Sequence, residues 1–301
     1  MLEQSTEVYS KIVGKEGYNM ELKEFLSKHM DISSRETTRL KKSGGIFVNG
    51  EEQNVRVKLR KGDLVKVVFN MEKNIFEPEE IEVEVLYEDE DVMAVYKNPY
   101  QVVHTTKKHK SGTIANGIAY MYQKRGINYK IRFINRLDRD TSGILLVGKN
   151  SFGQMFLSKQ MIEKTIKKKY YAIVENVVEK DEFTIDLPIG RESEDEVKRK
   201  VFDGGQPSVT HVKVAKRFKD ASLVEIDLET GRTHQIRVHM SHIGHPLIGD
   251  PLYGNKSEII DRQALHSYYI KFNRTRTYEE VELSTHLPDD MKRLVEYLEG
   301  K

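Results

Sequence analysis

Three short stretches of the chain carry the side chains that acid–base or nucleophilic chemistry requires. The first is Asn135-Arg136-Leu137-Asp138-Arg139-Asp140-Thr141-Ser142-Gly143, a run dense in charge that leads directly into the apolar residues 144–147. A turn at the end of a buried strand is where a rigid scaffold often presents reactive groups. An ionised aspartate in such a turn can act as a nucleophile or as a base. The alternative is a plain surface turn in which Asp140 and Thr141 bond backbone amides.

The second stretch combines cations with aromatic rings. Lys167, Lys168 and Lys169 directly precede Tyr170 and Tyr171. Lysines suit contacts with phosphate groups, while a tyrosine offers a flat face to a base and a phenol for proton transfer. The alternative is a basic strand edge on which the two rings only pack.

The third stretch is residues 229–239, with the sequence ETGRTHQIRVH. We expect a strand at residues 236–239. If the strand covers the whole stretch, its period of two divides the side chains between two faces. One face then holds Thr233, Gln235, Arg237 and His239, and the other holds Arg232, His234, Ile236 and Val238. Polar groups on both faces are unusual for a purely structural strand, because buried polar groups need partners. A cleft lined with charge is therefore expected here.

Histidines are frequent at and after the third stretch, and they raise the question of a metal site. They are His234, His239, His242 and His245. Their spacing is not that of a helical His-Glu-x-x-His site, and no carboxylate lies beside them in the motif. We expect these histidines to serve in hydrogen bonding or RNA contact, and we expect no metal.

Composition bounds the kind of protein that carries these stretches. The 301 residues suffice for one large domain, or for one large and one small domain. Basic residues dominate the charges of residues 35–66, whereas acidic ones dominate residues 77–91, which predicts a basic binding module joined to a second unit. The chain has no cysteine, which excludes disulfides, thiolate zinc sites and cysteine nucleophiles. A polar beginning and the lack of a long apolar run favour a soluble, cytoplasmic protein without a membrane span.

The elements that position these residues divide into two groups. Near the N-terminus the pattern predicts a helix over 19–30, a second helix capped by Ser33 or Ser34, and strands at 46–48, 55–59 and 64–69. Further on it predicts strands at 83–87, 92–96, 144–147, 170–174 and 223–228, a helix over 150–162, and a last helix with Pro288 in its first turn. Helices and strands do not alternate regularly, which favours an α+β fold with a mixed or antiparallel sheet.

The three stretches together resemble the motifs of a known family. The run Arg136-Leu137-Asp138-x-x-Thr141-Ser142-Gly143 is similar to the signature of the RluA-type pseudouridine synthases. Lys168-x-Tyr170, residues 231–239 and the turn at 245–254 resemble that family's later motifs, in the same order. Two positions depart from it: Asn135 stands where the family usually has histidine, and Asn98-Pro99-Tyr100-Gln101 replaces a Lys-Pro-x-Gly loop.

Residues 18–68 resemble a second known unit, the small RNA-binding domain of ribosomal protein S-four type, also called the alpha-L motif. The resemblance implies an RNA-binding domain at 1–70, a linker at 71–82 and a catalytic domain at 83–301. It implies RNA contacts from Arg35, Arg39, Lys41, Lys42 and Asn49. For the fold it implies a mixed, largely antiparallel, bent sheet flanked by helices and loops.

The family resemblance also implies an activity. Specific uridines in RNA would be isomerised to pseudouridine, with large-subunit (23S) ribosomal RNA as the preferred substrate and transfer RNA as the alternative. Nothing is oxidised or donated in this reaction, so no cofactor is expected, and we expect a monomer. Asp138 would be the essential carboxylate, Arg237 its ion-pairing partner, and Tyr170 the residue that stacks on uracil. Substrate contacts would come from Arg136, Thr141, Lys168, Arg232, His234 and Gln235, with Arg136 filling the gap left by the displaced base.

Two other classes of function fit parts of the same pattern. A non-catalytic RNA-binding or ribosome-assembly factor would explain the basic N-terminal module, but it does not require Asp138, Tyr170 and Arg237. A glycosidase could use Asp138 and Asp140 as its acid and nucleophile. Release of tritium from labelled uridine in RNA separates the first rival from a synthase, and release of free uracil would indicate the second.

Overall fold

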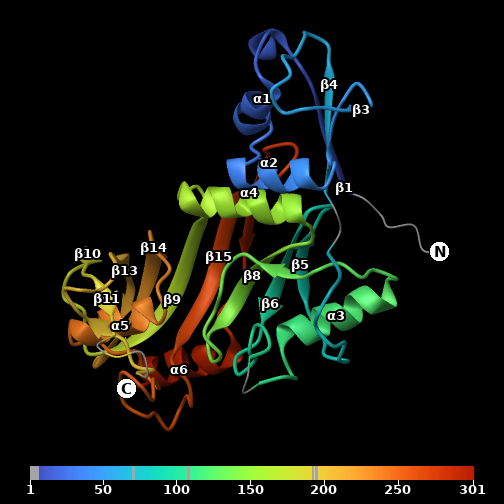
Figure 1. Ribbon diagram of the computed structural model, residues 1–301. Coiled ribbons are helices and arrows are strands. Elements are labelled where there is room, and N and C mark those ends of the chain that lie inside the picture. The colour runs from blue at the N-terminus through green and yellow to red at the C-terminus, as the bar shows by residue number, and fades with distance from the viewer. Residues whose placement is uncertain (1–6, 70–71, 107–108, 192, 194–195) are drawn as a thin grey trace.

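The architecture comes from a computed structural model, which describes residues 7–69, 72–106, 109–191, 193 and 196–301 (Figure 1). The expected boundary between the first unit and the linker, at residues 70 and 71, lies outside the described residues, as do residues 1–6. Two separate large sheets organise the chain, one of four strands near the N-terminus and one of ten strands in the remainder.

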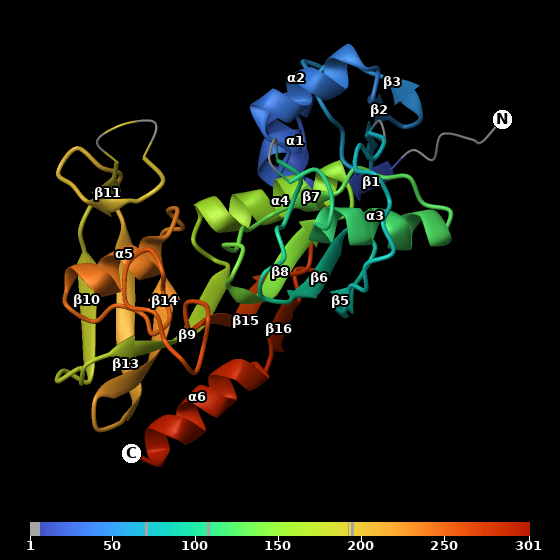
Figure 2. The same cartoon turned by 90° about the horizontal axis from the view of Figure 1, so that it is seen from below.

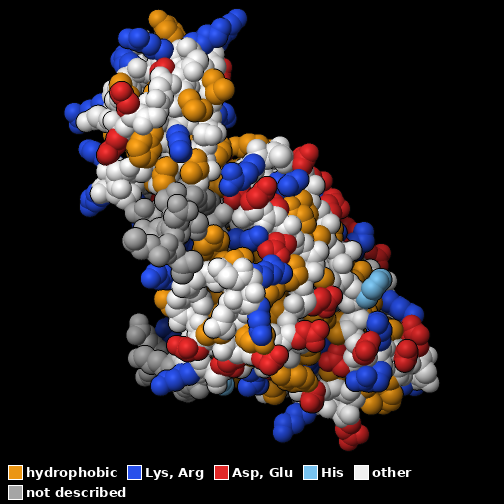
Figure 3. Space-filling model, turned by 90° about the vertical axis from the view of Figure 1, so that its right-hand side faces the viewer, with side chains coloured by type: hydrophobic (Ala, Val, Ile, Leu, Met, Phe, Trp, Pro, Cys, Tyr) orange, Lys and Arg blue, Asp and Glu red, His pale blue; other side chains and the backbone are white. Residues whose placement is uncertain are grey.

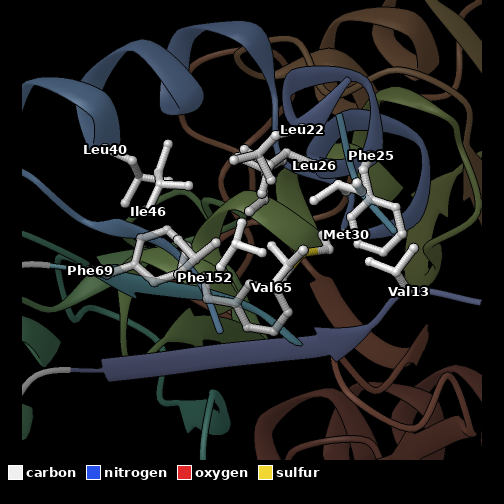
Figure 4. Close-up of a cluster of buried hydrophobic side chains, with 14 residues drawn as sticks. Val13, Leu22, Phe25, Leu26, Met30, Leu40, Ile46, Val65, Phe69 and Phe152 are labelled. Carbon is white, nitrogen blue, oxygen red and sulfur yellow. The ribbon is translucent and has the colours of Figure 1, made fainter. Parts of the chain in front are cut away.

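The N-terminal segment, residues 7–69, packs two helices against the small sheet. Its elements are β1 Glu7–Ile12, the 3-10 turn Lys15–Gly17, α1 Leu22–His29, α2 Ser34–Lys42, β2 Ile46–Val48, β3 Glu51–Glu52 and β4 Leu64–Phe69. The sheet order is β1-β4-β2-β3. Apolar side chains spaced for a helix, including Leu22, Phe25 and Leu26, enter one core with Val65 of β4 (Figure 4). As predicted, Ser33 caps α2 by accepting a hydrogen bond from the Glu36 amide.

The strand expected at residues 55–59 is wrong. Glu51–Glu52, which form β3, pair with β2, and the residues that follow leave the sheet until β4 begins. The carbonyl groups of Val55 and Val57 instead accept hydrogen bonds from the amides of Lys23 and Leu22. These amides lie in the first turn of α1 and have no partner within the helix, so the segment serves as a backbone cap.

The N-terminal segment is packed against helix α4, Ser151–Ile162, of the remainder of the chain (Figure 1). Phe152 of α4 lies inside the segment's own hydrophobic core, and its ring centroid is 4.3 Å from that of Tyr9. Lys159 of the same helix pairs with Asp31. Apolar burial and an ion pair therefore hold the two parts together.

The large sheet is mostly antiparallel. Its strands are β5 Val85–Glu88, β6 Val92–Lys97, β7 Arg132–Phe133, β8 Ser142–Gly148, β9 Lys167–Glu175, β10 Glu182–Asp186, β13 Val209–Arg217, β14 Ala221–Leu228, β15 Leu265–Asn273 and β16 Glu280–Ser284. The main order is β10-β13-β14-β9-β15-β8-β6-β5, with β7 and β16 paired to β8 and β15. Among these described strands, β15 and β8 form the parallel pair. A short hairpin, β11 Ile189–Gly190 with β12 Lys200–Val201, stands apart.

Helices cover both faces of this sheet. They are α3 Ile114–Lys124, α4, α5 Gln235–His242 and α6 Asp289–Glu299 (Figure 2). In β8, Leu145 and Val147 pack with α3, whereas Ile144 and Leu146 pack with α4. The predicted α+β class with a largely antiparallel sheet is confirmed. Within the described residues, no helix has the length and apolar character needed to cross a membrane.

Leu137, in the charged turn before β8, fixes where this turn sits on the sheet. It contacts the cluster under α3 and also the cluster that joins β9, β14 and α5. The turn therefore lies between α3 and α5, above the middle strands. Gly143 follows the turn because β15 passes closely there: a Cβ at this position would lie 2.1 Å from the Ser267 carbonyl oxygen, and φ is +121°.

Candidate active site

A cavity of about 230 Å³ opens between the charged turn, β9 and α5. Asp138, Tyr170 and Arg237 all line it. These residues come from three distant parts of the sequence, and they are the three to which the family resemblance gave catalytic roles. The fold thus places a carboxylate, an aromatic ring and a guanidinium around one space.

Arg237 connects two carboxylates. Its Nη1 donates a hydrogen bond to Asp138 Oδ2 at 3.1 Å. Its Nε and Nη2 donate to the two oxygens of Asp250 at 2.7 and 2.8 Å. This second contact is bidentate and fully buried, so it fixes the plane of the guanidinium. Asp250 therefore orients the arginine that faces Asp138.

Asp250 is held as an anion by its surroundings. Burial by itself raises the pKa of this carboxyl, but the hydrogen bonds and charge of Arg237 and the amides of Leu252 and Tyr253 lower it further, so the pKa lies below its ordinary value. Gly249 makes this position possible, since a Cβ there would lie 2.4 Å from the Arg262 carbonyl oxygen. The family resemblance includes the turn at 245–254 but gave Asp250 no role.

Asp138 differs from its neighbouring carboxylates in having a free oxygen. Its side chain is 28% exposed, and only Oδ2 meets Arg237; Oδ1 accepts no hydrogen bond from the described part of the chain. Both oxygens of Asp250 are occupied, and both oxygens of Asp140 accept from Arg139. Asp138 is thus the carboxylate with one oxygen fixed and one available to a substrate.

Two buried cations outside the charged turn hold its backbone. Lys97 of β6 donates to the carbonyl oxygens of Arg139 and Thr141 at 2.7 and 2.6 Å. Arg262 donates to the carbonyl oxygen between them, that of Asp140, at 3.0 Å. Asp290 of α6 binds Arg262 through two hydrogen bonds of 2.6 and 2.9 Å. Three consecutive carbonyl groups are therefore fixed by side chains that no sequence motif indicated.

Tyr170 forms a wall of the cavity and is almost fully buried. Burial, together with the negative charges of Asp138 and Asp227, raises the pKa of its phenol to about 12, against a smaller lowering effect of a hydrogen bond with Ser267. The phenol is therefore neutral at physiological pH. It can stack on a base and relay a proton, but it does not rest as a phenolate.

The strand expected at residues 236–239 is wrong, because these residues belong to helix α5. His234 precedes the helix in the left-handed region, with φ +59°, and turns the chain into it. A helix places residues three apart on one face, so His234 and Arg237 lie together, and the two-faced arrangement expected for a strand does not apply. His234 Nε2 lies 3.8 Å from Asp138 Oδ2, and burial lowers the pKa of this histidine.

Several of the expected substrate-binding residues form internal hydrogen bonds. Gln235 is buried, accepts from the Thr230 hydroxyl and the Arg232 amide, and donates to Val209 and Thr210. The Thr141 hydroxyl accepts from Gln263. Asn135, the departure from the family's histidine, bonds the β8 backbone at Ile144 and Leu146. Thr141, Asn135 and Gln235 line the cavity. Many of their hydrogen-bonding groups, however, bond the protein itself and stabilise the cavity walls.

Other expected residues keep their charged ends available. Arg136 is exposed, lines the cavity and has no hydrogen-bond partner among the residues described. Arg232 is exposed as well and donates to the Pro207 carbonyl at 3.2 Å. Lys168 lines the cavity but is buried. The cavity mouth is therefore cationic.

The expected RNA contacts of the N-terminal segment have different surroundings. Arg35, Lys41 and Lys42 of α2 are exposed, and several Lys and Arg side chains lie along the edges of this part of the molecule on the face that Figure 3 shows. Arg39 pairs with Glu72 at 2.6 Å. The Asn49 amide is engaged within the segment, where it donates to Asp63 and accepts from the Leu64 amide.

The histidines considered for a metal also have internal partners. His239 bonds the Thr210 hydroxyl and the Leu187 carbonyl. His234 bonds the Tyr253 hydroxyl at 2.9 Å, and His245 bonds the Glu175 carbonyl at 3.1 Å. These contacts agree with the hydrogen-bonding role expected from the sequence.

Comparisons with known proteins converge on one family. The model of the family described as RNA pseudouridylate synthase matches residues 91–242. The chain is 42% identical over 279 residues to the uncharacterized RNA pseudouridine synthase YjbO of Bacillus subtilis, covering 92% of this chain and 98% of the relative. It is 35% identical over 283 residues to ribosomal large subunit pseudouridine synthase D of Neisseria meningitidis, covering 89% and 75%.

Solved structures give the same result. Human RNA pseudouridylate synthase domain containing 1 is 25% identical and superimposes with a TM-score of 0.57, over 75% of this chain and 98% of the human chain. The cavity residues Asp138, Tyr170 and Arg237 lie within the stretch that the family model covers.

Proposed function

Because the chain belongs to the RNA pseudouridylate synthase family, we propose that it isomerises uridine in ribosomal RNA and that Asp138 is its catalytic carboxylate. The enzyme class, an isomerase that acts on RNA, follows from the family. The observation that supports the assignment of Asp138 is its place in one cavity with Arg237 and Tyr170. We assign these three residues the catalytic roles.

The reaction makes three demands on the cavity. The N1–C1′ bond of the target uridine must break, the base must turn over and bond through C5 to C1′, and the C5 proton must leave. Asp138 Oδ1 is the atom available to the ribose, either for attack on C1′ or for removal of the C2′ proton. Arg237 stabilises the ionised carboxylate that both routes need.

Tyr170 and Arg136 serve the base. The Tyr170 ring is the flat surface on which uracil can stack and turn. Since its phenol is neutral, we propose that it relays the C5 proton to a final acceptor such as Asp138. Arg136 is exposed beside the cavity, where it can enter the space that the everted nucleotide leaves in the RNA and offset part of the unstacking cost.

Ribosomal RNA is the substrate that we favour. A relative that shares 35% of the aligned residues is named a ribosomal large subunit pseudouridine synthase. The N-terminal segment adds exposed cations on α2, which suit phosphate contacts. We propose that residues 1–70 are an RNA-binding domain, 71–82 a linker and 83–301 the catalytic domain, that the enzyme acts as a monomer in the cytoplasm, and that transfer RNA is the alternative substrate.

The test compares cells with and without this gene. Pseudouridines are mapped in ribosomal and transfer RNA by carbodiimide-dependent stops of reverse transcription. The gene is then returned as the wild type, as Asp138→Asn or as Asp140→Asn. We expect ribosomal sites to vanish without the gene, to return with the wild type and largely with Asp140→Asn, and to stay absent with Asp138→Asn.

Two outcomes would contradict the proposal. Sites that return fully with Asp138→Asn would show that this carboxylate is not essential. Sites lost only from transfer RNA would leave the enzyme class intact and make transfer RNA the substrate. Purified Asp138→Asn protein should also bind the mapped RNA with a Kd close to that of the wild type, because the change removes no phosphate contact.

A further inference from the structure

A groove of about 620 Å³ continues from the active-site cavity. The two spaces share Met161, Lys168, Leu228, Gly231 and Arg232 as lining residues. Its volume lies within the range of roughly 300–1,000 Å³ that is typical of ligand sites. An RNA chain whose uridine occupies the cavity must leave it in some direction, and this groove is a continuous path.

Lys168 stands at the junction of the two spaces with an ammonium group that lacks a partner. Only 7% of the residue is exposed, and none of the described residues accepts a hydrogen bond from it or lies within 4.0 Å as an ion pair. Its Nζ would be 3.9 Å from a Cβ built on Gly231, which lines both spaces. Burial lowers the pKa of Lys168, and the charge of Asp227 offsets only part of that effect. A buried cation that no carboxylate contacts directly is costly, so an anion bound at Lys168 would complete the site.

One wall of the groove is apolar and ends in an exposed side chain. Met161 and Ile162 form the C-terminal end of α4 and line the groove, and Ile162 is 81% exposed. An isoleucine so open to water has little packing against the part of the chain that the structure describes. Its flat branched surface, beside a cation, suits the face of a nucleobase.

The rim of the groove carries further charge. Lys167 is exposed and unpaired within the described chain, whereas Lys164 is engaged by Glu229 at 2.7 Å and Glu229 also contacts His211 at 2.8 Å. Glu229 is thus neutralised by its own partners, whereas Asp227, which also lines the groove, forms no ion pair with the described residues and acts on Lys168 only through its charge. Lys167 and Lys168 remain for an incoming anion.

We propose that this groove is a subsite for a nucleotide next to the target uridine, whose phosphodiester binds Lys168 and whose base lies on Met161 and Ile162. The inference rests on the proposed function, since it needs an RNA chain in the cavity. It adds a site that selects or orients the neighbouring residue of the substrate. Substrate choice would then depend on a backbone contact and an apolar base contact outside the catalytic trio.

The phosphate contact is tested by a double-mutant cycle between enzyme and RNA. Synthetic RNA hairpins contain the mapped uridine. Each carries a single neutral methylphosphonate at one of four positions, which are the two nearest phosphodiesters on the 5′ side and the two nearest on the 3′ side. Single-turnover rates are measured with wild type, Lys168→Met and Lys180→Met, the last an exposed lysine of a remote groove. A charge-assisted hydrogen bond predicts a loss of roughly tenfold to a hundredfold for Lys168→Met on normal RNA.

The expected result is coupling at one position only. When the contacted phosphodiester is neutral, the single-turnover rates of wild type and Lys180→Met should fall by the factor expected for Lys168→Met on normal RNA. The rate of Lys168→Met, already lowered, should fall little further. The position of coupling tells whether the groove holds the 5′ or the 3′ neighbour. Full additivity at all four positions would overturn the phosphate assignment.

The base contact gives an independent test that does not disturb a buried residue. Ile162→Ser is compared with Ile75→Ser, a control at an isoleucine that is 75% exposed elsewhere, on RNA with and without an abasic neighbour at the coupled side. We expect Ile162→Ser alone to lower the rate severalfold and to become insensitive to the abasic change. Equal sensitivity of both variants would overturn the base assignment. If the wild type forms no pseudouridine in any RNA, the proposed function itself fails, which is a distinct outcome.

Discussion

Asp250→Asn is the change that tests most directly how the site is built. Asp250 is fully buried and accepts two hydrogen bonds from Arg237 and two from backbone amides. The asparagine side chain has nearly the same shape, but one of its atoms becomes a donor that faces another donor. The change therefore removes a charge and one strong hydrogen bond while it leaves the volume of the site intact.

The magnitude follows from the two carboxylates that share the arginine. Breaking a buried ion pair on one side costs about 3–5 kcal/mol. Arg237 retains Asp138 at 3.1 Å, so we expect the lower end, about 3 kcal/mol of unfolding free energy at pH 7. Loss of the fixed guanidinium should also let Asp138 rotate, which we expect to lower kcat by roughly tenfold to a hundredfold. KM for RNA should change little, because Asp250 lines no part of the cavity.

The pH dependence has a definite sign. The pKa of Asp250 is below its ordinary value in the folded protein, so the unfolded chain takes up the proton first as the pH falls. Its stabilisation is complete above the ordinary value of about 3.9 and is lost as the pH falls through the folded-state pKa. The stability difference between wild type and Asp250→Asn should therefore be full at pH 7 and shrink below about pH 4.

Urea unfolding at a series of pH values and single-turnover kinetics with excess enzyme measure both effects. Asp186→Asn, at an exposed aspartate of β10, is the matched control and should match the wild type in both assays. Unchanged kcat in a variant that has lost stability would show that Asp250 serves the fold alone. Unchanged stability would refute the charge argument itself.

Three further changes probe the other parts of the site. Lys97→Met should leave two turn carbonyl groups without their donor, costing about 1–3 kcal/mol of unfolding free energy, and should lower kcat with little change in KM; a change in KM alone would refute a positioning role. Asp290→Asn, in the last helix, should also lower the unfolding free energy and kcat, because it frees Arg262 from its partner. Urea unfolding and steady-state kinetics measure the two effects, and activity equal to that of the wild type would contradict the coupling. Tyr170→Phe keeps the ring, so RNA binding by filter assay should persist, while tritium release from C5 should slow by roughly 10²–10⁴-fold; release at the normal rate would exclude the phenol as a relay.

Local patterns in the sequence predicted α1, α2, α4, α6 and about half of the strands, gave no expectation for α3, β13 or β15, and misjudged two segments. Helix α4 was predicted from the apolar spacing of residues 150–162, and in the structure Asn150 caps it. The strand expected at residues 236–239 was wrong because alternation was read over a few residues only. Ile236 and Met240 lie four apart and are buried together, and that spacing indicates a helix.

The sequence pointed to candidate site residues that lie in motifs and gave no sign of the distant residues that hold them. Asp138, Tyr170 and Arg237 were assigned roles because the stretches around them resemble motifs of the family. Lys97 and Arg262 show no such pattern, since a lone cation in a strand or loop is normally solvated. Their function exists only when the fold brings β6 and the segment before β15 to the same turn, and no spacing along the chain encodes that meeting.

The charged turn is ordered although a loop with four charges in five residues would be expected to stay solvated and flexible. Arg136, Asp138, Arg139 and Asp140 all belong to it. Ordering a residue costs about 1–2 kcal/mol of backbone entropy, and the turn's own hydrogen bond from the Thr141 amide to the Asp138 carbonyl offsets little of it. The bonds from Lys97 and Arg262 to three consecutive carbonyl groups oppose this cost as well. They bind the backbone and not the carboxylate, so Asp138 is fixed in place while its Oδ1 stays free, which a direct salt bridge to either cation would prevent.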